Sequence, residues 1–359
     1  MTYPEFRIDC LHFRGDIPCK PHKDTGVHCA SCQQFSPQDG WILVIKLGAI
    51  GDVIRTTPLL HKLRSEYPTK SICWLTYSPD ILPAAVHKPL AFSPESLLWI
   101  QNTDFDLCIN LDKDPHACAL ASSVRTNELW GFTLRNGKPS PANERATHKF
   151  NTGLFDDVNK ANTKHYVDEI FDICGWSFAG EEYVLDVPAS GRFASLRTNG
   201  KPLIGLNTGC GDRWTSRKWR DEQWIELISL LQEAGMQPML LGGKQEHDVN
   251  TKFHNETGAL YPGFFPLRDF MEQMNECDAV VSAVTMAMHV AVGLRKPLIL
   301  MNNIFNPHEF ELYGRGEIIQ PDKSCHCFFR GTCVNKEYHC MDSLQPAAVA
   351  AAVQRSLKQ

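Results

Sequence analysis

The stretch KLGAIGDVIRTTP, residues 46–58, most narrowly limits what this chain can fold into. It follows the apolar run Trp41–Ile45, so the pattern predicts a strand, then a glycine loop, then a helix. Gly48 and Gly51 are expected to allow positive φ and the close approach of a ligand to the backbone. Asp52 stands at the predicted helix start, where the N-terminal dipole favours a carboxylate. This Asp is either a helix cap or a functional group, and the segment alone leaves both open.

Strand and helix patterns then alternate along the chain, which predicts an α/β fold with parallel sheets. At 359 residues the chain is too long for one ordinary domain, so we expect two lobes. The polar segment 135–164 is predicted to be a long loop that contacts an acceptor, and 184–201, around Pro188, to be the connection between lobes. The expected parts are a cysteine-rich leader at 1–40, an N-terminal lobe at 41–190, a C-terminal lobe at 191–345 with a cysteine-rich tail, and a terminal helix at 346–359.

Charge and hydropathy exclude several classes of partner. The formal net charge is -5, with a pI near 6.3, and the basic residues are scattered, so no nucleic-acid-binding surface is expected. The N-terminus MTYPEFRIDC lacks the apolar core of a signal peptide, and no run approaches the roughly 18 apolar residues that a membrane span needs. We therefore expect a cytoplasmic protein.

The second lobe opens with GLNTGCGDRWTSRKW, a strand followed by a loop of phosphate-binding composition. Glycine amides can cradle oxyanions, hydroxyls add hydrogen bonds, and cations offset a diphosphate charge. Surface solubility is the alternative explanation for so many cations. Further along, LLGGKQE ends a strand with a carboxylate that either accepts hydrogen bonds from a ribose or simply starts a helix. The candidate ligands are Thr208, Gly209, Gly211, Arg213, Thr215, Arg217, Lys218 and Glu246.

Four segments in this order, KLGAIGDVIRTTP, NTGCGDRW, LLGGKQE and VTMAMH, resemble glycosyltransferase family 9, the ADP-heptose:lipopolysaccharide heptosyltransferases. Members of that family commonly show an Asp-Thr-Gly-x-x-His run in the donor site. Thr285 and His289 match this run, whereas Val284 replaces the acid and Met286 replaces the glycine. His289 is either a core histidine or a phosphate ligand. The resemblance implies the GT-B architecture, in which two Rossmann-like lobes face a cleft, with the acceptor on the N-terminal lobe and the nucleotide on the C-terminal lobe.

The implied reaction is an inverting, metal-independent transfer of a heptose from a nucleotide diphosphate sugar, ADP-heptose, to a hydroxyl in a lipopolysaccharide-type glycan. The resemblance makes Asp52 the catalytic base, while Arg213, Lys218 and the loop amides would stabilise the departing diphosphate. No catalytic cofactor is expected. A lipid-linked acceptor would bring the protein to the inner membrane face as a peripheral protein.

Three other functions stay open at this point. The acceptor could be a protein side chain, because an iron-binding, cysteine-rich branch of protein heptosyltransferases is known. A nucleotide-sugar epimerase or hydrolase would use the same fold and would release product from the donor without an acceptor. A degenerate, metal-stabilised binding module would bind the donor without turnover, and the replacements at Val284 and Met286 suggest it.

Eight of the fourteen cysteines cluster near the two ends of the chain. Without a signal peptide, metal binding explains such clusters better than disulfides do, with isolated thiols as the bland alternative. Zinc is the expected structural metal, with iron or an iron-sulfur cluster as the alternative, in two sites or in one shared site. The leader follows Cx8Cx9CxxC, with Cys10, Cys19, Cys29 and Cys32, and the tail follows CxCx5Cx6C, with Cys325, Cys327, Cys333 and Cys340.

Overall fold

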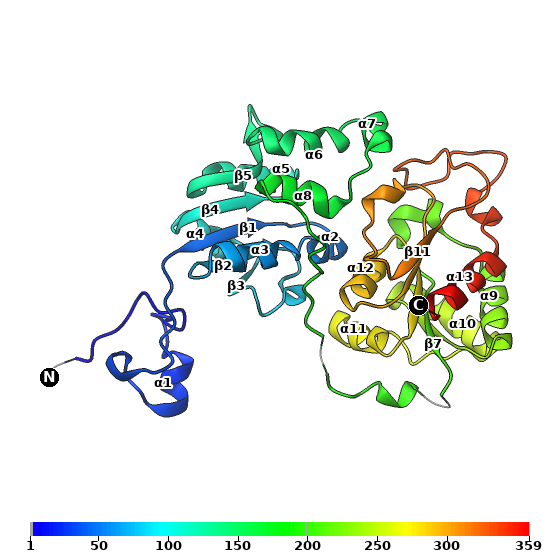
Figure 1. Ribbon diagram of the computed structural model, residues 1–359, viewed down its shortest axis with the longest axis horizontal. Helices are drawn as coiled ribbons and strands as arrows, with labels where there is room; N and C mark the ends of the chain where they lie inside the picture. The colour runs from blue at the N-terminus through cyan, green and yellow to red at the C-terminus, as the bar shows by residue number, and fades with distance from the viewer. Residues whose placement is uncertain (1–2, 188, 198–199, 359) are drawn as a thin grey trace. The chain divides into compact units, whose positions relative to one another are not determined.

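The computed structural model describes residues 3–187, 189–197 and 200–358 (Figure 1). The chain divides into two compact units, one formed by Met1–Gly48 with Leu59–Thr147 and the other by Ala49–Pro58 with His148–Gln359. Each unit is built on its own β-sheet. Pro188, in the predicted connection between lobes, lies outside the described residues.

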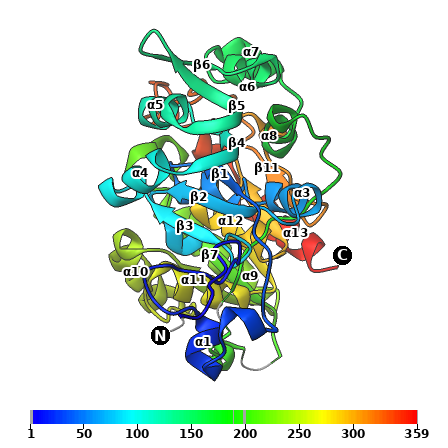
Figure 2. The ribbon, with the colours of Figure 1, turned by 90° about the vertical axis from the view of Figure 1, so that its left-hand side faces the viewer.

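The sheet of the first unit has the strand order β3-β2-β1-β4-β5-β6, and Figure 2 shows these strands one above another in this order. Neighbouring strands are parallel except for the hairpin of β5 and β6. The predicted parallel sheet is thus confirmed. The strands are β1 (Trp41–Ile45), β2 (Ser71–Thr76), β3 (Lys88–Ala91), β4 (Asp104–Asn110), β5 (Arg125–Arg135) and β6 (Lys138–Pro141).

Helices of the first unit cover this sheet and close its core. Helix α5 begins with a cap in which Asp114 accepts a hydrogen bond from the His116 amide, and it packs against β4 and β5. Leu43, Ile45 and Cys108 from neighbouring strands lie in the apolar cluster beneath. These helices are α3 (Leu59–Glu66), α4 (Pro94–Gln101) and α5 (Pro115–Ser123), whereas α1 (Lys20–Thr25) lies in the leader; 3-10 turns lie at Cys29–Ser31, Pro79–Ile81 and Glu144–Ala146.

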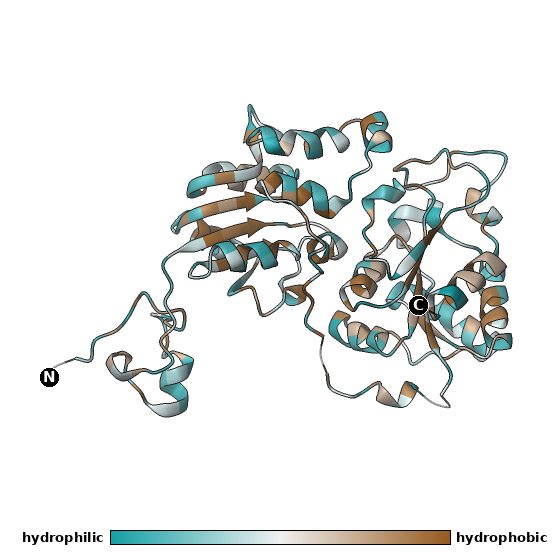
Figure 3. Ribbon diagram, viewed as in Figure 1, coloured by the Kyte–Doolittle hydropathy of each residue, from teal (hydrophilic) through white to brown (hydrophobic). Residues whose placement is uncertain are grey.

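The sheet of the second unit is parallel throughout, in the order β11-β10-β9-β7-β8. Its strands are almost wholly apolar, which suits a sheet buried on both faces (Figure 3). The chain proceeds from β7 to β8 on one side and returns to β9 on the other, so the loops after β7 and β9 diverge and leave a crevice. The strands are β7 (Leu203–Asn207), β8 (Gln237–Leu241), β9 (Ala279–Ala283), β10 (Leu298–Met301) and β11 (Gly316–Ile319).

Two helix pairs organise the second unit: α9 packs against α13, and α2 packs against α12. No helix in the described residues is long and apolar enough to cross a membrane. The helices are α2 (Ile50–Ile54), α6 (Thr147–Thr152), α7 (Asp156–Ala161), α8 (Tyr166–Cys174), α9 (Asp221–Glu233), α10 (His247–Thr257), α11 (Leu267–Asn275), α12 (Met286–Gly293) and α13 (Pro346–Ser356); 3-10 turns lie at Ala194–Leu196, Asp212–Arg217, Lys244–Glu246, Pro307–Glu309 and Cys340–Ser343.

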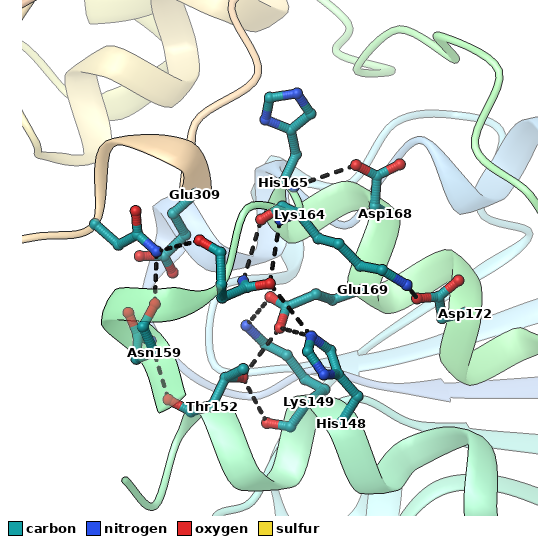
Figure 4. A network of polar contacts seen from close by, with 12 residues as sticks. His148, Lys149, Thr152, Asn159, Lys164, His165, Asp168, Glu169, Asp172 and Glu309 are labelled. Atoms are coloured by element: carbon teal, nitrogen blue, oxygen red, sulfur yellow. Dashed lines mark hydrogen bonds and ion pairs between the residues drawn. The ribbon is translucent and has the colours of Figure 1, made fainter. Parts of the chain in front are cut away.

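The segment 135–164 is not the long loop that its composition predicts, because it contains β6, α6 and α7. Tertiary contacts hold these short elements. Glu169 of α8 is 1% exposed and accepts hydrogen bonds from Lys149 Nζ at 2.5 Å and Thr152 Oγ1 at 3.0 Å (Figure 4). Asn159 Nδ2 of α7 donates to the Thr152 carbonyl at 2.9 Å. A buried carboxylate with such partners fixes polar helices that would be marginal alone.

Candidate active site

A cavity of about 710 Å³ lies in the second unit, at the carboxyl ends of β7, β8 and β9 and beside the start of α2. This is where an open parallel sheet binds its ligands, because the loops diverge at the point where the strand order reverses. The cavity brings together eight residues singled out in the sequence: Gly51, Asp52, Gly209, Gly211, Arg217, Glu246, Thr285 and His289.

Asp52 lies in the first turn of α2 but is not the cap residue, since the N-cap position belongs to Ala49. Its carboxylate Oδ1 instead pairs with Arg55 Nη2, one helical turn on, at 2.7 Å. The same guanidinium donates from Nη1 to Glu309 Oε1 at 3.3 Å and lies 3.5 Å from the centre of the Tyr166 ring. Arg55 therefore joins two carboxylates that line one cavity.

Burial lowers the pKa of the Arg55 guanidinium, but the charges of Asp52, Tyr166 and Glu309 outweigh burial and hold that pKa above its ordinary value. A permanent cation between the two acids fixes the orientation of both carboxylates. The sequence analysis gave Arg55 no role. Only the spacing of Asp52 and Arg55, three residues apart on one helix, could have indicated the first ion pair.

Glu309 reaches the cavity because its loop, after β10, is tied to α7. Asn306 Nδ2 donates to the Asn159 carbonyl at 2.6 Å and to the Asn162 carbonyl at 2.7 Å. The Asn306 side chain also accepts a hydrogen bond from the His308 amide at 3.1 Å, which shapes the 3-10 turn that carries Glu309. These bonds leave the Glu309 side chain 13% exposed at the cavity wall.

The glycines of the first motif do not take the predicted positive φ, at either Gly48 or Gly51. A Cβ at Gly51 would lie 2.5 Å from Cδ2 of His289, so glycine permits the contact of α2 with α12. The loop before Gly51 is fixed in the first unit by Asp112, which accepts hydrogen bonds from Leu47 N at 2.5 Å and Gly48 N at 3.1 Å. Lys46 Nζ completes this anchor, 2.7 Å from Asp112 Oδ1.

We expect Gly51→Ala to destabilise the protein by about 1–3 kcal/mol, the typical cost of forcing an extra carbon into a packed interior. The matched control is Gly48→Ala in the same loop, where a Cβ meets no atom within 4 Å and the backbone needs no positive φ. Urea unfolding of both variants measures the difference. Equal stability of the two variants would show that the contact with His289 does not require glycine.

Glu246, in the loop after β8, lies against the loop after β7. Glu246 Oε2 accepts a hydrogen bond from Gly243 N at 2.8 Å. A Cβ at Gly209 would overlap the Glu246 carboxylate, so glycine is needed there for close approach. Gly211 takes a φ of +70°, a conformation that suits glycine. The structure thus gives Glu246 a role in shaping the loop in addition to its place in the cavity wall.

Arg217 is the cation that the loop after β7 presents to the cavity. It is 6% exposed, and Nη2 donates to the Cys210 carbonyl at 2.8 Å. Its buried Nε has no hydrogen-bond partner among the described residues, and no described carboxylate forms an ion pair with it. Burial lowers the pKa of Arg217 to about 10, so it stays charged at neutral pH. A buried guanidinium without an acid partner suits an anion such as a phosphate.

Four other predicted ligands do not line this cavity. Arg213 is exposed beside the Trp214 ring, and Lys218 lines a separate surface hollow. Thr208 Oγ1 donates to Asn250 Oδ1 at 2.6 Å, and Thr215 Oγ1 donates to the Gly331 carbonyl at 3.3 Å. The 3-10 turn Asp212–Arg217 sets the directions of Arg213 and Thr215, which the sequence could not show.

Thr285 and His289, which match the Asp-Thr-Gly-x-x-His pattern, lie at the start of α12 and on α12, and both line the cavity. Thr285 caps α12 by accepting a hydrogen bond from Ala287 N at 3.2 Å. Burial, helped by the charge of Arg55, lowers the pKa of His289 to about 3, and its Nδ1 has no partner among the described residues. Burial thus favours the neutral imidazole of His289 at physiological pH. Val284 and Met286 also line the cavity and make this part of its wall apolar.

The depressed pKa of His289 predicts a pH-dependent stability. The unfolded chain binds a proton near the ordinary pKa of 6.5, whereas the folded chain resists it down to about 3, so stability falls as pH drops through this range. Between pH 7 and pH 5 this group should remove about 2 kcal/mol. Urea unfolding at both pH values should show that His289→Gln reduces the dependence by this amount. An identical dependence in the variant and the wild type would contradict buried, neutral His289.

The tail cysteines approach one another, although the described residues contain no group of three or more His, Cys, Asp or Glu side chains that could hold a metal ion as they stand. Cys327 and Cys333 lie 3.7 Å apart, sulfur to sulfur, and a hydrogen bond links the thiols of Cys325 and Cys340. Asn303 Nδ2 donates to Cys340 Sγ at 3.3 Å. Zinc or iron at this cluster stays a prediction.

The sequence model of glycosyltransferase family 9 (heptosyltransferase) matches residues 160–339, half of the chain, including the loops that form most of the cavity. The chain belongs to glycosyltransferase family 9. The sequence resemblance noted at the outset is thereby confirmed, and so is the expectation that this family 9 protein is a glycosyltransferase. No curated protein matches it by sequence.

Solved structures agree with the fold of this family 9 protein. A glycosyltransferase family 9 protein from Veillonella parvula DSM 2008 superposes with a TM-score of 0.70 at 17% identity, covering 89% of this chain and 98% of the other. ADP-heptose lps heptosyltransferase II of E. coli superposes with a TM-score of 0.64 at 16% identity, covering 89% of this chain and 98% of the other. The iron-containing dodecameric glycosyltransferase TibC of enterotoxigenic E. coli H10407 superposes with a TM-score of 0.55 at 13% identity, covering 89% of this chain and 77% of the other. The two parallel sheets are therefore those of a GT-B-like heptosyltransferase fold.

Proposed function

We propose that this glycosyltransferase moves a heptose from ADP-heptose to a hydroxyl of a lipopolysaccharide-type glycan, with inversion at the anomeric carbon. The observation that carries the proposal is one cavity that holds both a carboxylate at a helix start, Asp52, and an unpaired buried cation in a glycine loop, Arg217. A base and a diphosphate site are the two groups that such a transfer needs. ADP-heptose is the donor named for the E. coli enzyme of similar fold.

In this mechanism Asp52 takes the proton from the acceptor hydroxyl as its oxygen attacks the anomeric carbon. The bond from that carbon to the diphosphate breaks in line, and the charge that develops on the departing ADP is met by Arg217 and the amides of Gly209 and Gly211. Arg55 holds the Asp52 carboxylate in place, and its second partner, Glu309, fixes the guanidinium. No step requires a metal or a catalytic cofactor.

Nucleotide-sugar turnover tests the proposal. The purified chain should release ADP from ADP-heptose only when a truncated lipopolysaccharide core is added, and mass spectrometry should find one heptose added. NMR of the product should show the anomeric configuration opposite to that of the donor. ADP release without acceptor would favour a hydrolase, and equal use of UDP-glucose or GDP-mannose would reject heptose as the specific donor sugar.

A protein hydroxyl is the second candidate acceptor, and the tail cysteines favour it. Their close approach is consistent with a metal-binding member of the family, and TibC, a glycosyltransferase of similar fold, contains iron. Adding serine-rich polypeptide and glycan acceptors in competition would separate the two candidates by the mass of the product. With a lipid-linked glycan, the enzyme would act as a peripheral protein at the inner membrane face; with a protein acceptor, it would need no membrane.

A further inference from the structure

The leader contains a second cysteine cluster that belongs to no part of the proposed reaction. Cys10, Cys19, Cys29 and Cys32 come from four positions in the first unit, and all four line one small cavity of about 20 Å³. None of them forms a disulfide. We propose that this cavity is a mononuclear metal site, in which four thiolates bind a single zinc or ferrous ion that holds the leader folded.

The folding of the leader requires a stabilising element other than an apolar core. Among its described residues, 3–40, only Cys10 and Pro21 are buried, while Tyr3, Phe6 and Ile8 are largely exposed. A segment of this size without a core is normally held by disulfides or by a metal. With disulfides absent and all four cysteines lining one cavity, metal ligation is the stabilising element that the residues can supply.

The backbone already has the shape that a pair of ligands needs. Cys29–Ser31 forms a 3-10 turn in which Cys32 N donates to the Cys29 carbonyl at 3.3 Å, so a CxxC pair is presented from one tight turn. Cys10 is fixed from the other side by an isolated β-bridge to Pro37. Cys19 is the N-cap residue of α1. The ligands thus come from three short structures that a central ion would join.

The surroundings of the cavity suit a thiolate-bound ion. Phe13, Pro21, Val27 and Phe35 give it an apolar lining. His12 also lines it, as does Arg7, whose guanidinium lies 4.3 Å from the centre of the Phe35 ring. Four thiolates around a divalent ion carry two net negative charges, and Arg7, which also pairs with Asp9, places one positive charge beside them.

The cavity is small. Its volume of about 20 Å³ is of the size that a single ion needs. No three of these side chains are yet positioned to hold a metal ion. Binding must therefore draw the thiols inward, and a leader with two buried residues offers little resistance to this movement.

Metal content of the full chain tests the site. Both the wild type and the Cys29→Ser/Cys32→Ser variant are purified without chelator and exposed to zinc. By elemental analysis, the variant should contain one zinc per chain less than the wild type. The matched control is Ser31→Ala, an exposed residue in the same turn, which should keep the wild-type content. Cys327→Ser and Cys333→Ser are then added to the wild type and to the Cys29/Cys32 variant to remove any metal bound by the tail. The difference of one zinc between these two proteins should stay the same.

Two further measurements do not depend on the stability of the variants. Cobalt(II) added to the wild-type chain should give the thiolate charge-transfer absorption and the visible bands of a tetrahedral site. Zinc should also slow the alkylation of the four leader thiols and the proteolysis of residues 3–40. Equal metal content in the wild type and the Cys29/Cys32 variant, or equal alkylation rates with and without zinc, would overturn the proposal, as would a disulfide between leader cysteines in the isolated protein.

Discussion

Asp52→Asn should lower the turnover of the nucleotide sugar by at least about 100-fold, the scale of a lost general base, while the affinity for the donor changes little. An amide keeps the shape of the carboxylate and can still contact Arg55, but it cannot accept the proton of the attacking hydroxyl. Single-turnover rates with saturating donor and acceptor give the chemical step, and calorimetry with ADP gives the affinity. The variant should stay folded because Arg55 retains its pairing with Glu309.

The matched control is Glu309→Gln, which makes the same acid-to-amide change on the other partner of the same guanidinium. It removes equal charge from the cavity without removing the proposed base, so its loss of activity should be clearly smaller. A Glu309→Gln variant as inactive as Asp52→Asn would show that the charge network, and not proton abstraction by Asp52, limits the reaction. Normal turnover by Asp52→Asn would remove the base assignment altogether.

Arg217→Ala should weaken ADP binding by about 1–3 kcal/mol, or about 5–150-fold, as expected for a lost charge-assisted hydrogen bond to a diphosphate. The buried guanidinium has a free Nε in the described structure and lines the cavity, so an anion would complete its hydrogen bonds. Calorimetry with ADP and with adenosine separates the causes. Only the ligand with phosphates should lose affinity.

Arg213→Ala is the control, because it removes the same charge from an exposed position in the same loop. Its ADP affinity should match that of the wild type. If Arg213→Ala weakened ADP binding and Arg217→Ala did not, Arg213 would be the diphosphate ligand, as the sequence predicts, and Arg217 would not. An equal loss of adenosine binding in Arg217→Ala would indicate a collapsed loop instead of a lost phosphate contact.

Local sequence carried enough information to predict the α/β fold and the edge of the sheet where the cavity lies. Apolar runs such as Trp41–Ile45 and Leu203–Asn207 form strands because burial on both faces of a parallel sheet requires continuous apolar side chains. Loops after such strands meet at one sheet edge, so Asp52 and the glycine loop could be singled out in advance. The loop predicted for segment 135–164 was wrong, because its short helices are stabilised by contacts with the buried Glu169, which local sequence does not show.

Sequence by itself determined the order of strands and helices, the family resemblance and the candidate Asp52, since each depends on residues close together in the chain. Tertiary structure alone decided that Arg55 contacts Glu309, 254 residues away, and that Gly51 is required by His289. It also decided that Arg217, and not Arg213 or Lys218, enters the cavity. Such contacts depend on the direction of side chains in a packed interior, and composition carries no information about direction.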